Sequence, residues 1–276
     1  MIVRGWTQWA LVAIAIGMAS IYLFPLYWMY VTSLKGASEI FVNPPTFWPA
    51  EPNGAIFGEV WVRRNMATYM GNSVFIASGV TAITVLLGSG CAYVLARYRN
   101  VWVDVMLFSI LMLQVLPASV MITPLYVGFS QLGLLNFPRT AVILAAAAKA
   151  MPFFVVLVRA TFMTVPRELE EAAMVDGTSR FGAFVRIVLP LARNGILVCA
   201  ILTFMSAFGE YIYSKSIIQS PPLQPASVGL SSFLGPNSRD WNGIMAFSAI
   251  YVTPILAVFV LLQRRIVSGL TSGALK

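Results

Sequence analysis

The sequence contains no histidine and only two cysteines, Cys91 and Cys199. Without histidine the chain cannot form a Ser-His-Asp triad, a His-Glu-x-x-His zinc site or an imidazole proton relay. Each cysteine stands alone within an apolar run, so neither a disulfide framework nor a cysteine metal site is indicated. The Gly-x-x-x-x-Gly-Lys-Ser/Thr phosphate loop is also missing. If ATP drives this protein, another chain must bind and hydrolyse it.

Charge is scarce as well. Only 10% of the 276 residues are charged and 59% are hydrophobic, whereas soluble domains carry roughly 25% charged residues. The net charge of +8 does not indicate nucleic-acid binding, because the Lys and Arg residues stand at the ends of apolar runs rather than on one soluble face. The composition therefore predicts an all-α integral membrane protein in contact with lipid.

Uncharged apolar runs predict six transmembrane helices, at about 20 residues per span. The first run, Gly5–Leu34, exceeds the roughly 7 to 15 residues of a signal-peptide core and is interpreted as an uncleaved span. The third contains Pro117 and Pro124, which predict a kinked or broken helix. The predicted spans cover residues 9–34, 71–96, 104–130, 139–160, 195–217 and 242–263. In the second span, Gly88, Ala92 and Ala96 recur every four residues, which predicts close helix packing.

An even number of spans places both termini on one side, and the positive-inside rule selects the cytoplasm. Eleven of the 18 Lys and Arg residues then lie on the cytoplasmic side and six on the other, with Lys149 inside a span. Segment 161–194 and the tail 264–276 are predicted to be cytoplasmic. Segment 35–70, which has four prolines, is predicted to form an irregular extracytoplasmic cap.

Segment 161–194 carries four of the ten acidic residues of the chain. Thr164 and Pro166 are typical of a helix start, and Gly177 is well placed to end that helix in the left-handed conformation. Thr178 or Ser179 can cap a second helix, which Pro190 is predicted to end. The segment is thus predicted to be a helix-turn-helix.

The second helix is amphipathic, with apolar residues at i, i+3, i+4, i+7 and i+8 starting from Phe181. Two interpretations of this stripe stay open on periodicity alone. It can pack on the protein's own helix ends or in the lipid interface, or it can dock in the groove of a partner protein.

One pattern in this segment resembles a known family. Glu171-Ala172-Ala173, three residues, Gly177, nine residues, Ile187, one residue and Leu189-Pro190 match the EAA motif of permease subunits of bacterial ABC importers. The closing Gln263–Lys276 resembles the tail of carbohydrate-type permeases, specifically the MalG-type subunit of maltose uptake. The resemblance covers nearly the whole chain.

This resemblance implies the ABC type I importer permease fold, with six transmembrane helices and a cytoplasmic helix-turn-helix coupling loop, in the bacterial inner membrane. It implies four partners: two cytoplasmic ATPase subunits that bind ATP and Mg²⁺, a second homologous permease subunit, and an extracytoplasmic sugar-binding protein. The chain itself would be neither an enzyme nor a cofactor protein, and Ser268–Lys276 is a secondary contact candidate. The residues predicted to couple to the ATPase are Glu171, Ala172, Ala173, Gly177, Phe181, Phe184, Ile187, Leu189 and Pro190.

Two ionisable residues are predicted to lie at membrane depth, Lys149 and Glu210. Charges at this depth usually face a bundle interior or a wet cavity, so both are candidates for a substrate path, with Gln114, Tyr211 and Tyr213 beside them. They can instead pair with each other, or serve as a gate while the companion subunit binds the sugar. A buried cation also suits a phosphorylated, sulfonated or carboxylated sugar. Other ABC substrates, and an ion-coupled secondary transporter, are the alternative functions.

Overall fold

The structure, a computed structural model, describes residues 5–98, 100–233 and 240–271. Within these ranges the chain is helical, with no strand. It divides into two compact units: one combines the residues up to Ala67 with Leu230–Pro254, and the other combines Thr68–Gly229 with the residues from Ile255 onward.

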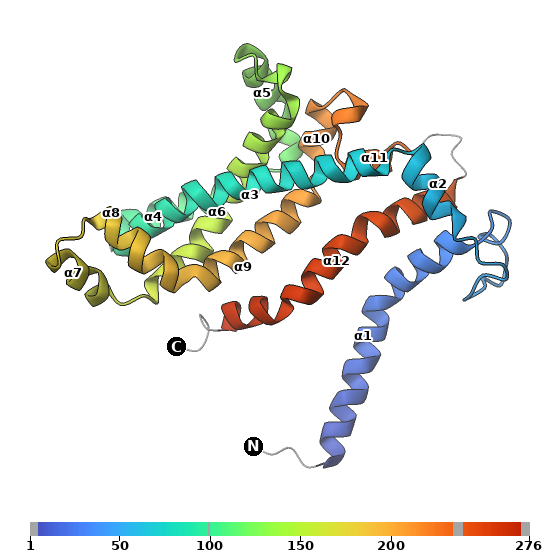
Figure 1. The fold of residues 1–276 in the computed structure, drawn as a ribbon, viewed down its shortest axis with the longest axis horizontal. Helices are drawn as coiled ribbons and strands as arrows, with labels where there is room; N and C mark the ends of the chain where they lie inside the picture. Colours follow the sequence, from blue (N-terminus) through green and yellow to red (C-terminus); the bar gives the residue numbers. More distant parts are fainter. Residues whose placement is uncertain (1–4, 99, 234–239, 272–276) are drawn as a thin grey trace. The chain divides into compact units, whose positions relative to one another are not determined.

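The first unit holds α1 (Gly5–Leu34), α2 (Ala55–Arg63) and the first part of α12 (Trp241–Thr271), all labelled in Figure 1. Every side chain of α1 from Gly5 to Pro25 is exposed. Because this surface is apolar, it is suited to contact with lipid or with another membrane helix.

The segment between α1 and α2 has no long helix and folds onto the end of α1. Lys35 is only 1% exposed: its ammonium donates to the carbonyl oxygen of Thr46 at 2.5 Å and lies 4.6 Å from the ring centroid of Trp28. The Thr46 hydroxyl in turn donates to Glu39 at 2.8 Å. The prediction of an irregular segment over 35–70 therefore describes its first part, up to Gly54, but α2 and the start of α3 lie within it and were not predicted.

The second unit is built on α3 (Met66–Arg97), α6 (Pro138–Met163) and α9 (Leu189–Phe208). α7 (Arg167–Val175) and α8 (Arg180–Ala183) lie together at one end of α6 and α9, as Figure 1 shows. Its other elements are α4 (Val101–Leu113), α5 (Ala118–Gln131), the 3-10 turns Leu134–Asn136 and Pro221–Leu223, the π-helical turn Phe184–Val188, α10 (Ile212–Ile217) and α11 (Ala226–Ser231).

The core of this unit depends on the small residues of α3. A Cβ atom added at Gly88 would lie 2.6 Å from Cδ1 of Phe154 in α6. One and two turns further on, Ala92 and Ala96 are 0% and 2% exposed and belong to the same buried cluster as Phe154 and Val158. The close packing predicted from the small-residue repeat is confirmed.

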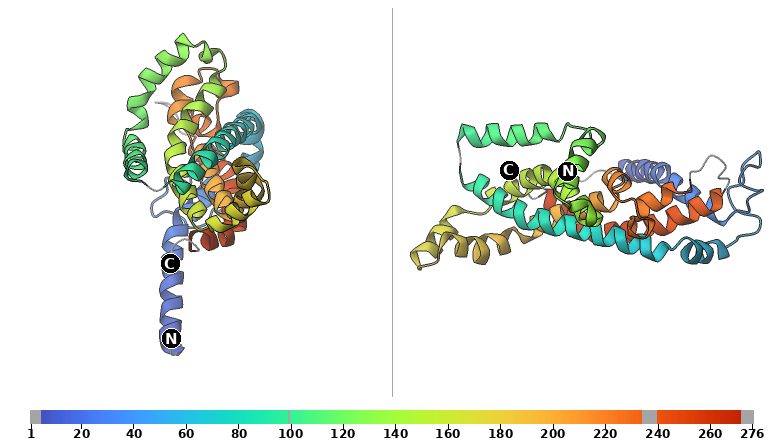
Figure 2. Two further views of the ribbon diagram at one scale, coloured as in Figure 1. Left: turned by 90° about the vertical axis from the view of Figure 1, so that its left-hand side faces the viewer. Right: turned by 90° about the horizontal axis from the view of Figure 1, so that it is seen from above.

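Five helical stretches of the described residues are long and apolar enough to cross a membrane: Gly5–Leu34, Met66–Arg97, Pro138–Met163, Arg180–Phe208 and Trp241–Gln263. The third predicted span, 104–130, is instead two shorter helices, α4 and α5, which meet at an angle in both views of Figure 2. The break that the prolines predicted lies at 114–117 and ends with Pro117. By helix length the structure shows five spans, and the count of six stays a prediction.

Two further boundaries differ from the prediction. The fifth span, 195–217, is not continuous, because α9 ends at Phe208 and α10 begins at Ile212. At the carboxyl end, α12 continues to Thr271, so the first part of the predicted tail 264–276 is helical. The remaining positions of that tail, and with them part of the contact candidate Ser268–Lys276, lie outside the described residues.

Candidate coupling element and cavity

α7, the turn after it and α8, residues 167–183, form the predicted helix-turn-helix and are called the α7–α8 element below. Gly177 in the turn has φ +87°, the left-handed conformation in which glycine has no steric penalty. The N–H of Gly177 donates to the carbonyl of Met174, and that of Thr178 to Ala173. Ser179 caps α8, its hydroxyl accepting from the N–H of Gly182 at 3.1 Å. Both the glycine turn and the serine cap were predicted.

The start of α7 differs slightly from the prediction. Thr164 ends α6, where its hydroxyl donates to the carbonyl of Thr161 at 2.8 Å. Pro166 alone precedes α7 as its N-cap residue. The carboxylates of Glu168 and Glu170 occupy the first turn, where the helix dipole favours negative charge.

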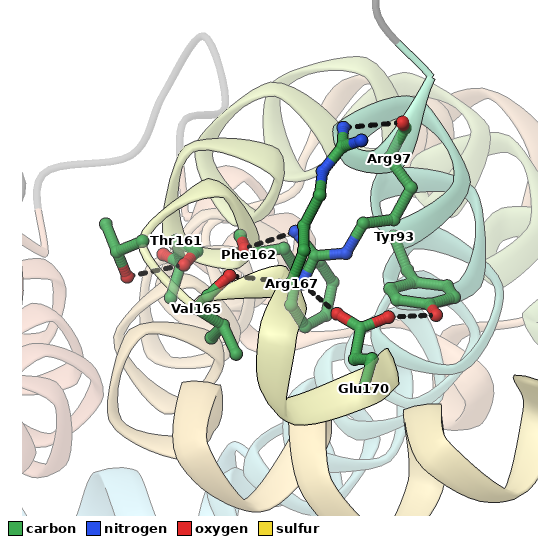
Figure 3. A network of polar contacts seen from close by, with 8 residues as sticks. Tyr93, Arg97, Thr161, Phe162, Val165, Arg167 and Glu170 are labelled. Carbon is green, nitrogen blue, oxygen red and sulfur yellow. Dashed lines mark hydrogen bonds and ion pairs between the residues drawn. The ribbon is translucent and has the colours of Figure 1, made fainter. Parts of the chain in front are cut away.

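A polar cluster of Tyr93, Arg97 and Glu170 attaches the α7–α8 element to α3. Figure 3 shows the Glu170 carboxylate accepting a hydrogen bond from the Tyr93 hydroxyl at 2.6 Å and forming an ion pair with Arg97. Glu170 is buried and Arg97 is largely buried, their side chains being 8% and 14% exposed. Removing one member of such a pair leaves the other charge buried and uncompensated, a cost of about 3–5 kcal/mol.

Arg97 also holds the end of α6. Its guanidinium donates to the carbonyl oxygens of Phe162 at 3.1 Å and Val165 at 3.4 Å. Arg167 donates back to the carbonyl oxygen of Arg97 at 2.6 Å (Figure 3). The ends of α3 and α6 and the start of α7 are therefore joined through one arginine.

The amphipathic stripe of the second helix is divided between two surroundings. The Phe184 ring lies 4.5 Å from the Tyr93 ring and 6.0 Å from the Phe162 ring, centroid to centroid, and Val188 is fully buried. Phe181, one turn earlier, is 74% exposed. Both open interpretations of the stripe thus describe part of it: Phe184 packs inside the chain, and Phe181 is free to meet a partner or lipid.

The other predicted coupling residues fall into the same two groups. Glu171, Ala172, Gly177 and Pro190 are exposed, while Ala173, Ile187 and Leu189 are half-buried. Glu171 makes no hydrogen bond or ion pair within the described part of the chain, in contrast to its neighbour Glu170. An exposed patch with one free carboxylate and little side-chain bulk can accept a close-fitting partner that carries a cation.

Pro190 does not end the second helix, which is a correction to the prediction. The helix passes from α8 through the π-helical turn Phe184–Val188 into α9, with Pro190 in the first turn of α9. The N–H of Leu189 bonds to the carbonyl of Phe184, five residues back. This wider turn accommodates the missing N–H of a proline without a break. The α7–α8 element is therefore continuous with a membrane-spanning helix.

All five predicted path residues line one cavity of about 650 Å³ in the second unit. Gln114 comes from the break between α4 and α5, Lys149 from α6, and Glu210, Tyr211 and Tyr213 from the break between α9 and α10. The remaining lining residues are Val80, Ala118, Ala146, Ala150, Phe153, Leu202, Thr203, Ser206, Ala207, Gly209 and Ile212. A mostly apolar cavity with a few convergent polar groups is typical of a ligand site.

The two charged residues of this cavity have different surroundings. The Glu210 carboxylate accepts from the N–H groups of Tyr213 at 2.7 Å and Ser214 at 2.9 Å and from the Ser214 hydroxyl at 2.5 Å. It therefore caps the start of α10. The Lys149 side chain is exposed and makes no ion pair with Glu210, although both lie in the described ranges. Its carbonyl oxygen accepts from the Gln114 amide at 3.2 Å. The alternative in which the two charges pair with each other is therefore not what this structure shows.

Sequence reasoning missed the roles of Tyr93, Arg97 and Glu170. Tyr93 and Arg97 are four residues apart at the end of a span and so share one helix face. A tyrosine and an arginine at that spacing could have been proposed as partners for a carboxylate of the acidic segment. Arg97 was instead interpreted only as a positive charge that sets the membrane topology.

The geometry defines the class of protein: a multi-pass membrane protein whose described residues are helical, with a polar helix pair at one end of α6 and α9 and a cavity in the same unit. The fold matches a crystal structure of a bacterial ABC transporter involved in the import of the acidic polysaccharide alginate, with a TM-score of 0.79 over 96% of this chain and 98% of that chain, at 20% identity.

The chain belongs to the family described as binding-protein-dependent transport system inner membrane component, whose model matches residues 65–272. It is 33% identical to the sulfoquinovosyl glycerol transport system permease protein SmoH of Agrobacterium fabrum, over 92% of this chain and 89% of the relative. It is 32% identical to the trehalose/maltose transport system permease protein MalG of Thermococcus litoralis, over 95% and 94%. It is also 30% identical to the diacetylchitobiose uptake system permease protein DasC of Streptomyces coelicolor, over 99% and 97%. The protein is thus an inner-membrane permease subunit of the carbohydrate ABC importer type, and the ATPase of such a transporter is a separate subunit.

Proposed function

We propose that this permease subunit forms one half of the membrane path of an ATP-driven importer, which moves a sugar or sugar derivative into the cytoplasm by alternating access. One observation carries the proposal. The unit that holds the cavity also holds the exposed residues of the EAA motif, Glu171, Ala172 and Gly177. This surface is joined to α9 by a continuous helix and to α3 by the Arg97–Glu170 ion pair. Such an arrangement can convert movement at the surface into movement of the cavity walls.

The proposed complex contains a second homologous permease subunit, two cytoplasmic ATPase subunits that bind ATP and Mg²⁺, and an extracytoplasmic sugar-binding protein. The family description supports a binding protein. So does the structure of an alginate ABC transporter with a periplasmic protein bound to an alginate pentasaccharide, which has the same fold at a TM-score of 0.66. The exposed apolar surface of α1 is available to the second permease or to lipid. Both chain termini and the α7–α8 element face the cytoplasm in this proposal.

ATP coupling is proposed to pass through the exposed part of the EAA motif. Glu171 pairs with a cation of the ATPase, and Ala172 permits close approach. In proteoliposomes containing the whole complex, Glu171→Lys is expected to leave membrane insertion intact and to uncouple ATP hydrolysis from uptake. Glu168→Lys is the matched control, because Glu168 is exposed on the same helix but lies outside the motif. Equal, full uptake by both variants would contradict the proposal.

An acidic sugar is the proposed substrate class, on the basis of Lys149. Its ammonium has no anionic partner in the described chain, whereas the Glu210 carboxylate is occupied by three donors. The cavity thus offers a free cation and no free anion. SmoH, named for a compound with a sulfo group, is consistent with this choice, while DasC and MalG are named for neutral sugars.

Two probes that differ in one group test the substrate class. Sulfoquinovosyl glycerol carries a sulfonate where glucosyl glycerol carries a hydroxyl. Lys149→Met is expected to lower uptake of the sulfonated probe about tenfold more than uptake of the neutral one, since losing one ion pair in a cavity costs roughly 1.5 kcal/mol or more. An equal loss for both probes would instead assign Lys149 to a gate.

A further inference from the structure

The adjacent carboxylates Glu170 and Glu171 face different surroundings. Glu171 is exposed, whereas Glu170 is 6% exposed and its carboxylate binds side chains of the same chain. Consecutive helical residues are about 100° apart around the axis, so one of two neighbouring acids can face inward while the other faces out. The family pattern includes Glu171, and Glu170 precedes it.

The inward carboxylate links α7 to α3 without a covalent connection. Its oxygens bind the Tyr93 hydroxyl and the Arg97 guanidinium, and Arg97 also donates to two carbonyl groups at the end of α6. The Arg97 guanidinium carbon lies 5.6 Å from the centroid of the Tyr93 ring, so the side chains of one α3 turn hold each other in place. A planar guanidinium can serve the carboxylate and the carbonyls together, which a lysine ammonium cannot.

The α7–α8 element is covalently connected to α9 and, through residues 164–166, to α6, but not to α3. The Tyr93–Arg97–Glu170 cluster adds a second, non-covalent route into α3, which lines the cavity through Val80, and a further link to α6, which lines it through Lys149. Without the cluster, movement of α7 can be taken up at the short connection 164–166 before it reaches α6.

We propose that Glu170 is a positioning residue that makes α3, α6 and α7 move together, so that displacement of the α7–α8 element reaches both sides of the cavity. This inference rests on the proposed function, because it assigns a second transmission route to the same coupling surface. Tyr93 and Arg97 complete the cluster, and neither needs to touch ATP, sugar or partner.

A labelling experiment on the whole complex in proteoliposomes tests the proposal. Cys91 and Cys199 are replaced by serine, and Ser206→Cys places one thiol in the cavity wall. The probe is a maleimide reagent, with ATP, Mg²⁺ and vanadate as the trigger. In this Ser206→Cys protein without further substitutions, the labelling rate is expected to change when the trigger is added. An unchanged rate in this protein would contradict the proposed function, and would not bear on the role of the Tyr93–Arg97–Glu170 cluster.

In Glu170→Gln the nucleotide-dependent change in labelling rate is expected to fall about tenfold, the range of a coupling free energy of 1–3 kcal/mol, while ATP hydrolysis continues. Arg97→Gln is expected to give the same loss, and the double variant no more than either. Asp104→Asn is the matched control: it removes a second ion pair of this unit, Arg159 to Asp104 at 3.6 Å, whose carboxylate side chain is 73% exposed.

Two results would overturn the inference. One is a full nucleotide response in Glu170→Gln, and the other is a double variant whose loss equals the product of the single losses, since independent effects multiply. If Glu170→Gln does not assemble with the ATPase, Arg97→Lys provides the same test, because it keeps the charge and loses the bridge to the two carbonyls. A full response in Arg97→Lys would then contradict the proposal.

Discussion

The Tyr93 hydroxyl donates a 2.6 Å hydrogen bond to the Glu170 carboxylate, across 77 residues of sequence. This bond joins the last turns of α3 to the first turn of α7. Because the acceptor is a buried, charged carboxylate, the bond is stronger than a hydrogen bond between neutral groups.

Tyr93→Phe is expected to lower the free energy of unfolding by about 1.5–3 kcal/mol, since the carboxylate loses one of its donors. The change removes only an oxygen atom and leaves the packing against Phe184 unchanged. Thermal unfolding of the purified protein in detergent measures the effect. Tyr98→Phe is the control, because Tyr98 is 57% exposed, and an equal loss in both variants would contradict the role of the buried hydroxyl.

Gly177→Val is expected to reduce coupled uptake while leaving membrane insertion intact. Nothing lies within 4 Å of a Cβ atom built at Gly177, so the penalty arises from φ +87° alone. A non-glycine residue there costs about 1–2 kcal/mol, less for asparagine. When ATP hydrolysis and uptake are measured in parallel, coupled uptake by Gly177→Asn should lie between that of the native protein and that of Gly177→Val. The reverse order of the two variants would argue against a backbone cause.

Gly88→Ala is expected to destabilise the packing of α3 on α6, because the added methyl group would lie 2.6 Å from Cδ1 of Phe154. Such overpacking typically costs about 1–3 kcal/mol. Gly90→Ala in the same helix is the control, since no atom lies within 4 Å of its added Cβ, and helix propensity even favours alanine. Thermal unfolding of both variants should show a clear loss of stability for Gly88→Ala only.

Glu210→Ala is expected to loosen the break between α9 and α10, because α10 loses the carboxylate that accepts from two of its N–H groups. Loss of a capping side chain costs about 0.5–2 kcal/mol. Hydrogen exchange of the 212–217 amides should accelerate, and those of α6 should not change. Unaltered exchange in α10 would show that the cap is dispensable.

The sequence predicted local structure correctly where a single residue determines the backbone conformation. Gly177, Ser179 and the break before Pro117 all lie where the sequence predicted a turn, a cap and an interruption. The five candidate path residues also share one cavity, because uncompensated polar groups within apolar spans tend to face the same interior.

The sequence did not predict which side chains point into the protein and which point outward. Glu170 and Glu171 are the same residue type one position apart, yet Glu170 is buried against Tyr93 and Arg97 while Glu171 is exposed. Phe181 and Phe184 belong to one periodic stripe, yet they are 74% and 9% exposed. Pro190 was predicted to end a helix because the π-helical turn before it, which absorbs the proline, has no clear sequence signal.

Coupling through the α7–α8 element requires that its outward side meets the ATPase. A photo-reactive amino acid placed at Ala172, which is exposed within the EAA motif, tests this claim in the assembled complex. The same group at Leu132, 73% exposed in the second unit but outside the motif, is the control. We predict an adduct with the ATPase subunit from position 172 and none from position 132. Absence of the adduct at 172, or equal adducts from both positions, would contradict the account.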